Sequence, residues 1–232
     1  MNYILLISLG LAPSLVWLLY YLRKDQHPEC IRMIMKVFLF GMISALPVVL
    51  IEMGIQGFLE ESGIKSTLLL SILEIFLGVA LIEEFVKYLV ARGEAIRNLE
   101  FDEPVDVMIY MIIAALGFAA VENILILFSL DYEFIFINTF FRFIGATFLH
   151  ALCSGTLGYF VAMSFYENKK GGRIFFQGLL LVTLLHGLYN FSIIEIDNIF
   201  RFTIPIFIIS GLAIFLAVAF KRLKQLKSIS KI

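Results

Sequence analysis

The segment TLLLSILEIFLGVALIEEFVKYLVA, residues 67–91, is apolar enough to cross a lipid bilayer, yet it carries two adjacent carboxylates. A transmembrane helix needs roughly 20 predominantly apolar residues, a length that this segment exceeds. Each ionised side chain within such a helix opposes membrane insertion by roughly 2.5–3.5 kcal/mol on translocon scales. Glu83 and Glu84 are nevertheless followed by Lys87 one helical turn later. We therefore expect these charges to have a role inside a bundle of helices.

The composition extends this interpretation to the whole chain of 232 residues. Its hydrophobic fraction is 61% and its mean hydropathy is +0.96, whereas soluble domains are roughly 45–50% apolar. A net charge of -1 gives no electrostatic basis for binding nucleic acid. Cys30 and Cys153 are too few to form a disulfide framework. The composition predicts a protein embedded in the lipid bilayer, with no nucleic acid partner and no folded soluble domain.

The apolar residues form about seven continuous runs, each near the length of a membrane span. They lack the alternation of barrel strands, so helices are favoured as the spanning structure. The predicted fold is an all-α polytopic transmembrane helix bundle, a single transmembrane domain over residues 1–232. The first run lacks a positively charged leader, and we expect it to be retained rather than cleaved as a signal peptide. The expected spans are residues 3–22, 33–58, 67–91, 105–130, 134–165, 174–195 and 202–220.

Basic residues offer an internal test of this span count, because positively charged loops tend to stay in the cytoplasm. They gather in every second loop and in the tail, whereas the intervening loops hold only Lys65 and Arg201. We therefore expect the N-terminus outside, the C-terminus in the cytoplasm and a basic cytoplasmic tail over 221–232. The clustered residues are Arg23, Lys24, Arg32, Lys36, Arg92, Arg97, Lys169, Lys170, Arg173, Lys221, Arg222, Lys224, Lys227 and Lys231.

The run 134–165 is overlong and contains Arg142. We expect part of DYEFIFINTFF, residues 131–141, to form a peripheral helix, with Arg142 at the outer interface. The depth of the candidate residues in the membrane raises a second question about the spans. Counted along the chain, Glu83 lies near the cytoplasmic end of its span and Glu122 near the outer end. Bringing them together requires tilted helices, or a third helix that continues into residues 92–97.

Ionisable side chains inside spans indicate function by default, because their burial in lipid is costly. Glu83 and Lys87 have the favoured i,i+4 order on a helix, but one lysine cannot fully neutralise Glu84 as well. Three further such residues lie on later spans. They are Glu122 in GFAAVEN, His150 in FLHALCSG and His186 in LLHGLYN.

Carboxylates and imidazoles are the groups that water activation requires. A catalytic zinc ion takes three protein ligands and a water. The candidate ligands for zinc or another divalent metal are Glu122, His150 and His186, with Glu83 or Glu84 as the base. Without a metal, the same carboxylate base could act with histidine and Asn190 as oxyanion donors. The residues leave this choice open, and the chain has no HExxH or GxGD motif.

The order of these motifs resembles the PrsW family of membrane-embedded proteases. That family is related to the CAAX prenyl endopeptidase and bacteriocin-processing group, whose motifs are EExxxR, FxxxH and HxxxN. A glutamate replaces the FxxxH histidine here, which favours the PrsW branch. The matching residues are Glu83, Glu84 and Lys87, then Phe118 and Glu122, then His150, and finally His186 with Asn190.

The resemblance implies an endopeptidase of the bacterial cell membrane, with its catalytic helices within about 67–195. It would make the first cut, called site-1 cleavage, in a single-span anti-sigma factor, which leads to release of the sigma factor under envelope stress. We expect Glu83 to activate water, Glu84 to hold Lys87 or another partner, and Asn190 to donate to the oxyanion. The alternatives are a proton- or ion-coupled transporter and a non-catalytic scaffold with interhelical hydrogen bonds. The transporter is disfavoured because no paired repeat is visible.

Overall fold

A computed structural model describes residues 3–24, 30–96, 103–166 and 170–226 of the chain. Helices account for nearly all of these residues, and no strand occurs among them. The all-α fold predicted from the apolar runs is therefore confirmed. Six helices in the described ranges are long and apolar enough to cross a membrane. They are α1 (Tyr3–Leu22), α2 (Ile31–Glu61), α5 (Pro104–Ser129), the segment Ile135–Phe165, α8 (Gly171–Glu195) and α9 (Phe200–Leu223).

The remaining expected span, 67–91, is a compound helix of four consecutive pieces. The Ser66 hydroxyl caps its start by accepting the Leu69 N–H at 3.3 Å. Two of its pieces are π-helical, with wider turns than an α-helix, and such turns are frequent at functional sites. The pieces are α3 (Thr67–Ile72), η1 (Leu73–Leu81), α4 (Ile82–Ala91) and η2 (Arg92–Ile96).

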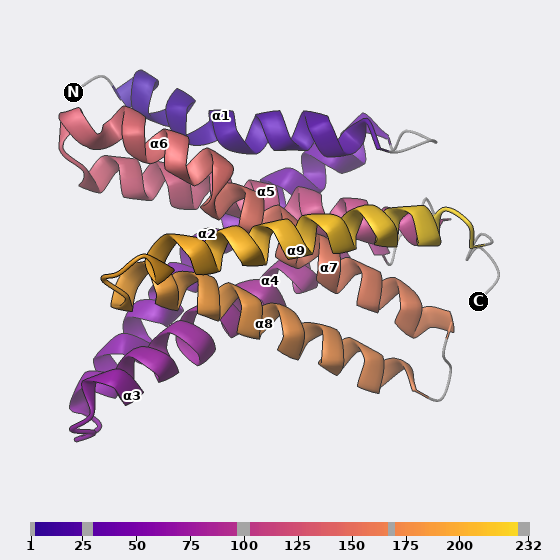
Figure 1. Cartoon of the computed structure of the whole chain (residues 1–232). Coiled ribbons are helices and arrows are strands. Elements are labelled where there is room, and N and C mark those ends of the chain that lie inside the picture. Colours follow the sequence, from indigo (N-terminus) through magenta and orange to yellow (C-terminus); the bar gives the residue numbers. More distant parts are fainter. Residues whose placement is uncertain (1–2, 25–29, 97–102, 167–169, 227–232) are drawn as a thin grey trace.

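The question of depth is answered by the length and tilt of this compound helix. It continues to Ile96, so Glu83 lies well inside it rather than at its end. Figure 1 also shows α3 inclined to α1 and α9. Both expected routes therefore help to bring Glu83 and Glu122 together. The polar connection beyond Ile96, residues 97–102, lies outside the described residues.

The overlong run 134–165 divides at Gly145 into α6 (Ile135–Ile144) and α7 (Ala146–Tyr166), preceded by the 3-10 turn η3 (Tyr132–Phe134). A Cβ atom on Gly145 would lie 2.5 Å from the Tyr189 hydroxyl, so the break needs a glycine. Only Ile135 is buried among the residues of α6, which suits the peripheral helix expected here. Arg142 differs from expectation because its side chain is only 14% exposed and turns inward toward α5.

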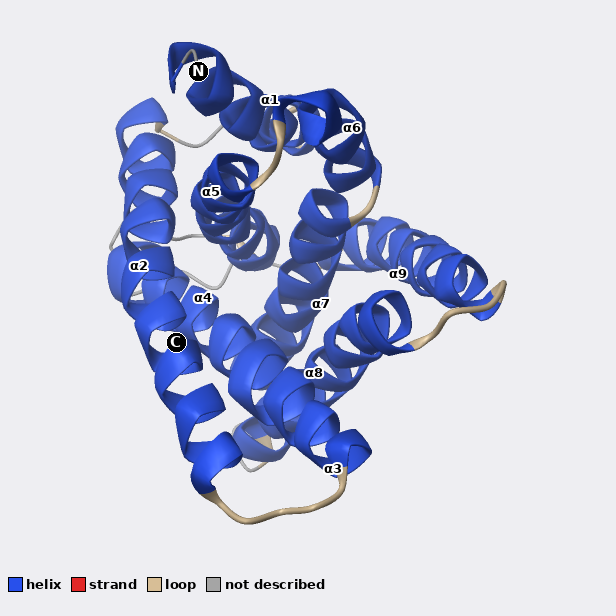
Figure 2. Ribbon diagram, turned by 90° about the vertical axis from the view of Figure 1, so that its left-hand side faces the viewer, coloured by secondary structure: helices blue, strands red, loops and turns tan. Residues whose placement is uncertain are grey.

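Helix α5 lies at the centre of the bundle, between α1, α2 and α7 (Figure 2). Its residues from Pro104 to Ala120 are all buried. Two glycines allow α2 and α5 to touch, as is common between membrane helices. A Cβ on Gly41 would collide with the Ala114 carbonyl oxygen, and a Cβ on Gly117 would collide with that of Phe38.

The helices alternate in direction, so α1 begins and α9 ends at opposite ends of the bundle (Figure 1). The end of α1, the start of α8 and the end of α9 lie at the same end of the bundle (Figure 1). These three ends carry basic residues, among them Lys24, Lys170 and Lys221. This agrees with an odd number of crossings, and the orientation with the N-terminus outside stays a prediction. Cys30 and Cys153 are both free thiols, as expected.

Candidate active site

Four buried ionisable side chains from α4, α7 and α8 converge at the middle of the bundle. We call Glu83, Glu84, His150 and His186 the Glu–His cluster. Each offers one ligand atom, and these atoms all lie within 4.8 Å of one another. None of the four side chains is exposed beyond a few per cent. Burying charges is costly unless partners compensate them, so the contacts of this cluster decide its chemistry.

Lys87 supplies the compensating charge from the same helix as the two glutamates. Its ammonium donates to Glu83 Oε2 at 2.8 Å, to Glu84 Oε1 at 3.0 Å and to His150 Nδ1 at 2.7 Å. Three donors therefore meet three acceptors. The ammonium also lies 4.6 Å from the centre of the Phe118 ring. Lys87 is fully buried and contacts both carboxylates rather than extending to the interface.

The two adjacent glutamates have different surroundings. Both oxygens of Glu84 are engaged, because Oε1 also contacts His186 Nδ1 at 3.0 Å and Oε2 accepts from the Ser154 hydroxyl at 2.8 Å. The contacts described for Glu83 all fall on Oε2, which lies 3.6 Å from His150 Nδ1 and 4.0 Å from His186 Nε2. Of these two glutamates, Glu83 is thus the one with an oxygen available for another partner.

The hydrogen bonds of His186 set its tautomer. An ionised carboxylate can only accept a hydrogen bond, so His186 Nδ1 donates to Glu84. The neutral ring then carries a lone pair on Nε2, the nitrogen nearest Glu83 Oε2. His186 therefore turns an unprotonated nitrogen toward Glu83.

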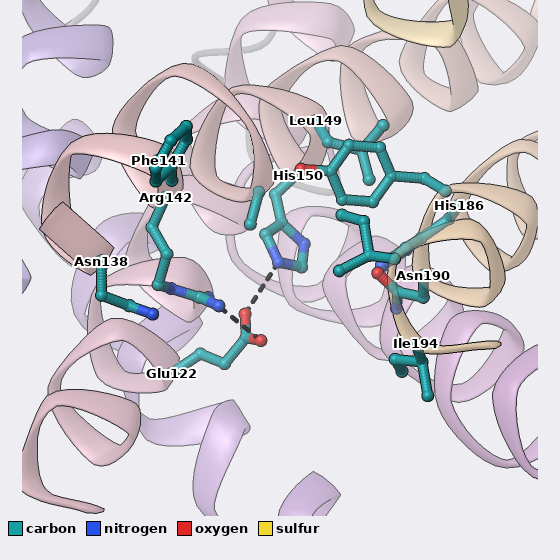
Figure 3. A pocket seen from close by; sticks show the side chains of 12 residues that line it. Glu122, Asn138, Phe141, Arg142, Leu149, His150, His186, Asn190 and Ile194 are labelled. Atoms are coloured by element: carbon teal, nitrogen blue, oxygen red, sulfur yellow. Dashed lines mark hydrogen bonds and ion pairs between the residues drawn. The ribbon is translucent and has the colours of Figure 1, made fainter. Parts of the chain in front are cut away.

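The same argument applies to His150 on the opposite side of the cluster. Its Nε2 donates to Glu122 Oε2 at 2.8 Å (Figure 3). Its Nδ1 is consequently unprotonated, and it accepts the hydrogen bond from Lys87. Each imidazole thus donates to a carboxylate from one nitrogen and keeps a lone pair on the other. This is the arrangement in which metal-binding histidines are usually held.

Glu122 lies behind His150, outside the four-residue cluster. Its Oε1 forms an ion pair with Arg142 Nη2 at 3.1 Å. Arg142 Nε donates to Asn123 Oδ1 at 2.5 Å, and Asn123 donates in turn to the Gly10 carbonyl and the Thr147 hydroxyl. Glu122, a candidate ligand from the sequence, is therefore placed where it orients His150.

A cavity of about 360 Å³ adjoins the cluster between α6, α7 and α8. Glu122, His150, His186 and Asn190 all line it, so four of the predicted site residues face one space (Figure 3). Glu83, Glu84 and Lys87 lie behind the two imidazoles rather than on the cavity wall. The cavity has the size expected of a ligand site.

The donor set of the cluster fits a divalent metal ion. Two unprotonated imidazole nitrogens and a carboxylate oxygen are a ligand set typical of catalytic zinc. Lys87 donates to the lone pair on His150 Nδ1, so an ion bound at that nitrogen requires the ammonium to withdraw to the carboxylates. Both carboxylates remain within reach of Lys87 on its own helix.

The sequence analysis did not assign Arg142 or Asn138 to the site, yet both line the cavity. The available signal was a charged residue within a run too long for one span. Ser154, in the same FLHALCSG stretch as His150, was not assigned a role either, and it donates to Glu84. These roles depend on how α6 and α7 are rotated, which the apolar pattern does not record.

Comparison with known proteins agrees with this geometry. A family model described as "PrsW family intramembrane metalloprotease" matches residues 29–219. The chain is 34% identical to Protease PrsW of Geobacillus kaustophilus over 82% of this chain and 80% of that protein. It is 32% identical to Protease PrsW of Oceanobacillus iheyensis over 80% of this chain and 81% of that protein. No solved structure matches the chain.

Fold, site and similarity together define a multi-pass membrane protein that hydrolyses peptide bonds. The chain belongs to the PrsW family of intramembrane metalloproteases. A third relative, Protease PrsW of Bacillus subtilis, is 29% identical over 86% of this chain and 88% of that protein. Family membership favours the protease over the transporter and scaffold alternatives.

Proposed function

We propose that the Glu–His cluster is the catalytic centre and that Glu83 is the general base. The observation that carries this proposal is the contrast between the two glutamates. Glu84 is fully engaged by Lys87, His186 and Ser154, whereas Glu83 has its described contacts on one oxygen. A base must accept a proton from water, and Glu83 has an oxygen with which to do so.

The tautomers of the two histidines support metal binding over direct oxyanion stabilisation. An unprotonated nitrogen can bind a metal but cannot donate to a developing oxyanion. His150 Nδ1 and His186 Nε2 would hold a zinc or other divalent ion together with a carboxylate oxygen from α4. Such an ion, when bound, supplies Lewis-acid activation of a water and of the scissile carbonyl. Measuring the metal content of the Glu83→Gln and Glu84→Gln variants identifies which carboxylate is the third ligand, because the variant that lacks this ligand should bind less metal.

The remaining steps belong to side chains of this protein. The scissile carbonyl enters the cavity beside Asn190, whose amide N–H donates to the oxyanion. Glu83 takes the proton of the attacking water and returns it to the leaving amine. Glu122 and Glu84 keep the imidazoles oriented, and Lys87 holds the carboxylate pair in place.

We further propose that the substrate is a single-span anti-sigma factor cut at its first, extracytoplasmic site. The motif order from Glu83 to Asn190 and the membership of the PrsW family support this proposal. In the same proposal, the catalytic helices lie within about residues 67–195 of a single transmembrane domain.

The test is cleavage of a candidate anti-sigma factor by purified protein in liposomes without an ion gradient. We expect wild type to cut, and Glu83→Gln and His186→Gln to lose activity. Glu74→Gln is the matched control, because Glu74 lies on the same compound helix outside the cluster. A chelator should abolish activity, and zinc should restore it. Undiminished cleavage by Glu83→Gln would overturn the assignment of the base.

The same assay separates the reaction from the substrate. An unrelated single-span peptide is tested beside the anti-sigma factor. Cleavage of the peptide alone would contradict the anti-sigma assignment and leave the endopeptidase standing. Retention of bound metal in a His150→Gln, His186→Gln double variant would contradict the metal site.

A further inference from the structure

Helix α6 contributes two polar side chains to the cavity beside the cluster. Asn138 and Arg142 lie one helical turn apart, so they share one face of the helix. Both line the cavity, opposite His186 and Asn190, with His150 between them (Figure 3). The other face of α6 exposes apolar side chains, including Phe140 at 55%. α6 thus presents a short polar strip to the interior of an otherwise apolar helix.

This polar strip carries hydrogen-bonding groups that the described part of the chain leaves unused. Asn138 Oδ1 and Arg142 Nη2 are buried, and neither has a hydrogen-bond partner among the described residues. Arg142 Nη2 faces Glu122 Oε1 as an ion pair at 3.1 Å, and that oxygen can engage one of the two N–H groups on Nη2 and leave the other. Buried polar groups without partners are uncommon in proteins and call for an explanation.

The strip is also held firmly, so the unused groups have fixed positions. Arg142 Nε is bonded to Asn123 on α5. The Trp17 indole N–H on α1 donates to the Phe143 carbonyl at 2.8 Å. An acceptor on Asn138 and a donor on Arg142, one helical turn apart, are therefore both present at one wall of the cavity, and Arg142 is held in place there.

An acceptor beside a donor matches a peptide group, which offers an N–H and a C=O. A substrate helix must unwind before its scissile carbonyl is exposed, and unwinding frees main-chain groups that lipid cannot satisfy. We propose that Asn138 and Arg142 bind the main chain of the unwound substrate segment beside the scissile bond. Asn138 Oδ1 accepts a substrate N–H, and Arg142 Nη2 donates to a substrate carbonyl. This inference rests on the proposed protease function and adds a substrate-binding wall to it.

The test uses Asn138→Leu, because Asn138 contacts neither Glu122 nor His150 in the described hydrogen bonds. The probe is a synthetic single-span peptide of the anti-sigma factor cut in the assay above. We expect KM to rise about 3–10-fold with kcat nearly unchanged, since the bond is present in both ground and transition states. Thr139→Val on the same helix is the control, because the Thr139 hydroxyl bonds within α6.

A depsipeptide series separates substrate binding from a structural effect. Each member replaces one main-chain N–H near the scissile bond with an ester oxygen. At one position the ester should raise the KM of the wild-type enzyme by the same factor as Asn138→Leu does with the amide substrate. With that ester substrate, Asn138→Leu should cause no further rise in KM. An equal effect of Asn138→Leu on amide and ester substrates would overturn the inference, although cleavage itself continues. If the Asn138→Leu variant does not fold, the wild-type enzyme alone provides the test. A wild-type KM that is unchanged by the ester at every position would also overturn the inference.

Discussion

The Glu–His cluster and the cavity beside it share two histidines but treat polar groups in opposite ways. In the cluster, Lys87 and its neighbours satisfy one another within a space that water hardly reaches. At the α6 wall of the cavity, buried polar atoms lack hydrogen bonds among the described residues. The side chains of the first region mostly bond one another, whereas the second region keeps buried polar atoms that the described residues leave without a hydrogen bond.

This contrast separates two tasks of an enzyme site. Groups that perform chemistry must be oriented before the substrate arrives, because preorganised dipoles need no rearrangement during the reaction. Groups that receive a substrate must remain free to bond it. Asn138→Leu tests the second kind of group, and variants of the cluster and its supporting residues test the first, beginning with the largest expected effect.

Glu83→Gln should lower kcat by roughly 10²–10⁴-fold, the usual contribution of a general base. Its melting temperature should stay close to that of wild type, because one oxygen of Glu83 carries all its described contacts. Glu84→Gln, in contrast, should lower the melting temperature in addition to kcat, since Lys87, His186 and Ser154 all form hydrogen bonds with this side chain. Turnover and thermal unfolding in liposomes measure both. Equal melting temperatures would remove the distinction between the two glutamates.

Lys87→Met should lower the free energy of unfolding by about 3–5 kcal/mol, because it leaves buried carboxylates without their partner. Lys36→Met is the matched control: Lys36 pairs with Glu94 at 2.7 Å, but its side chain is 48% exposed. An exposed pair is worth about 0–1 kcal/mol. Equilibrium unfolding in mixed micelles compares the two. Similar losses would mean that the cluster does not depend on its lysine.

Glu122→Gln should reduce metal affinity or activity by about 10–100-fold, as for a carboxylate that orients a metal-binding histidine. Metal titration with a competing chelator gives the affinity. Glu61→Gln, at an exposed side chain of α2 and outside the cluster, is the control. Complete loss of metal from Glu122→Gln would instead make Glu122 a direct ligand, as its place among the sequence candidates allows.

Phe118→Leu should have the smallest effect, about 1 kcal/mol of unfolding free energy, because it removes a cation–π contact with Lys87. Phe176→Leu, at a side chain 67% exposed on α8, controls for the loss of an aromatic ring. Combining Phe118→Leu with Lys87→Met should give less than the sum of the two losses. Strict additivity would show that the ring does not support the ammonium.

The series of membrane-spanning helices could be predicted because the length of an apolar run is a local property of the chain. The break at Gly145 could not, since it depends on the Tyr189 side chain of another helix. The π-helical turns of η1 escaped prediction for a similar reason: η1 packs against α8, where a Cβ on Gly187 would meet the Phe76 ring at 2.5 Å. Pattern alone carries no record of such contacts.

The candidate site likewise has a part that the sequence predicts and a part that depends on contacts between helices. The cost of charge in lipid singled out Glu83, Glu84, His150 and His186, and the structure brings them together. Which carboxylate lies behind which imidazole depends on helix rotation and tilt, so the Glu84–His186 and Glu122–His150 pairs were not foreseen. Arg142 and Asn138 were missed because the helix that carries them was expected to lie at the periphery, with Arg142 at the outer interface rather than turned inward.

The π-helical segment Leu73–Leu81 has a consequence for the evolution of this chain. It fixes the angular phase of α4 relative to α3, and in an α-helix each residue advances that phase by about 100°. Deleting one residue between 73 and 81 would turn Glu83, Glu84 and Lys87 as a block away from the histidines. Substitutions within this segment should therefore be tolerated more readily than a change in its number of residues.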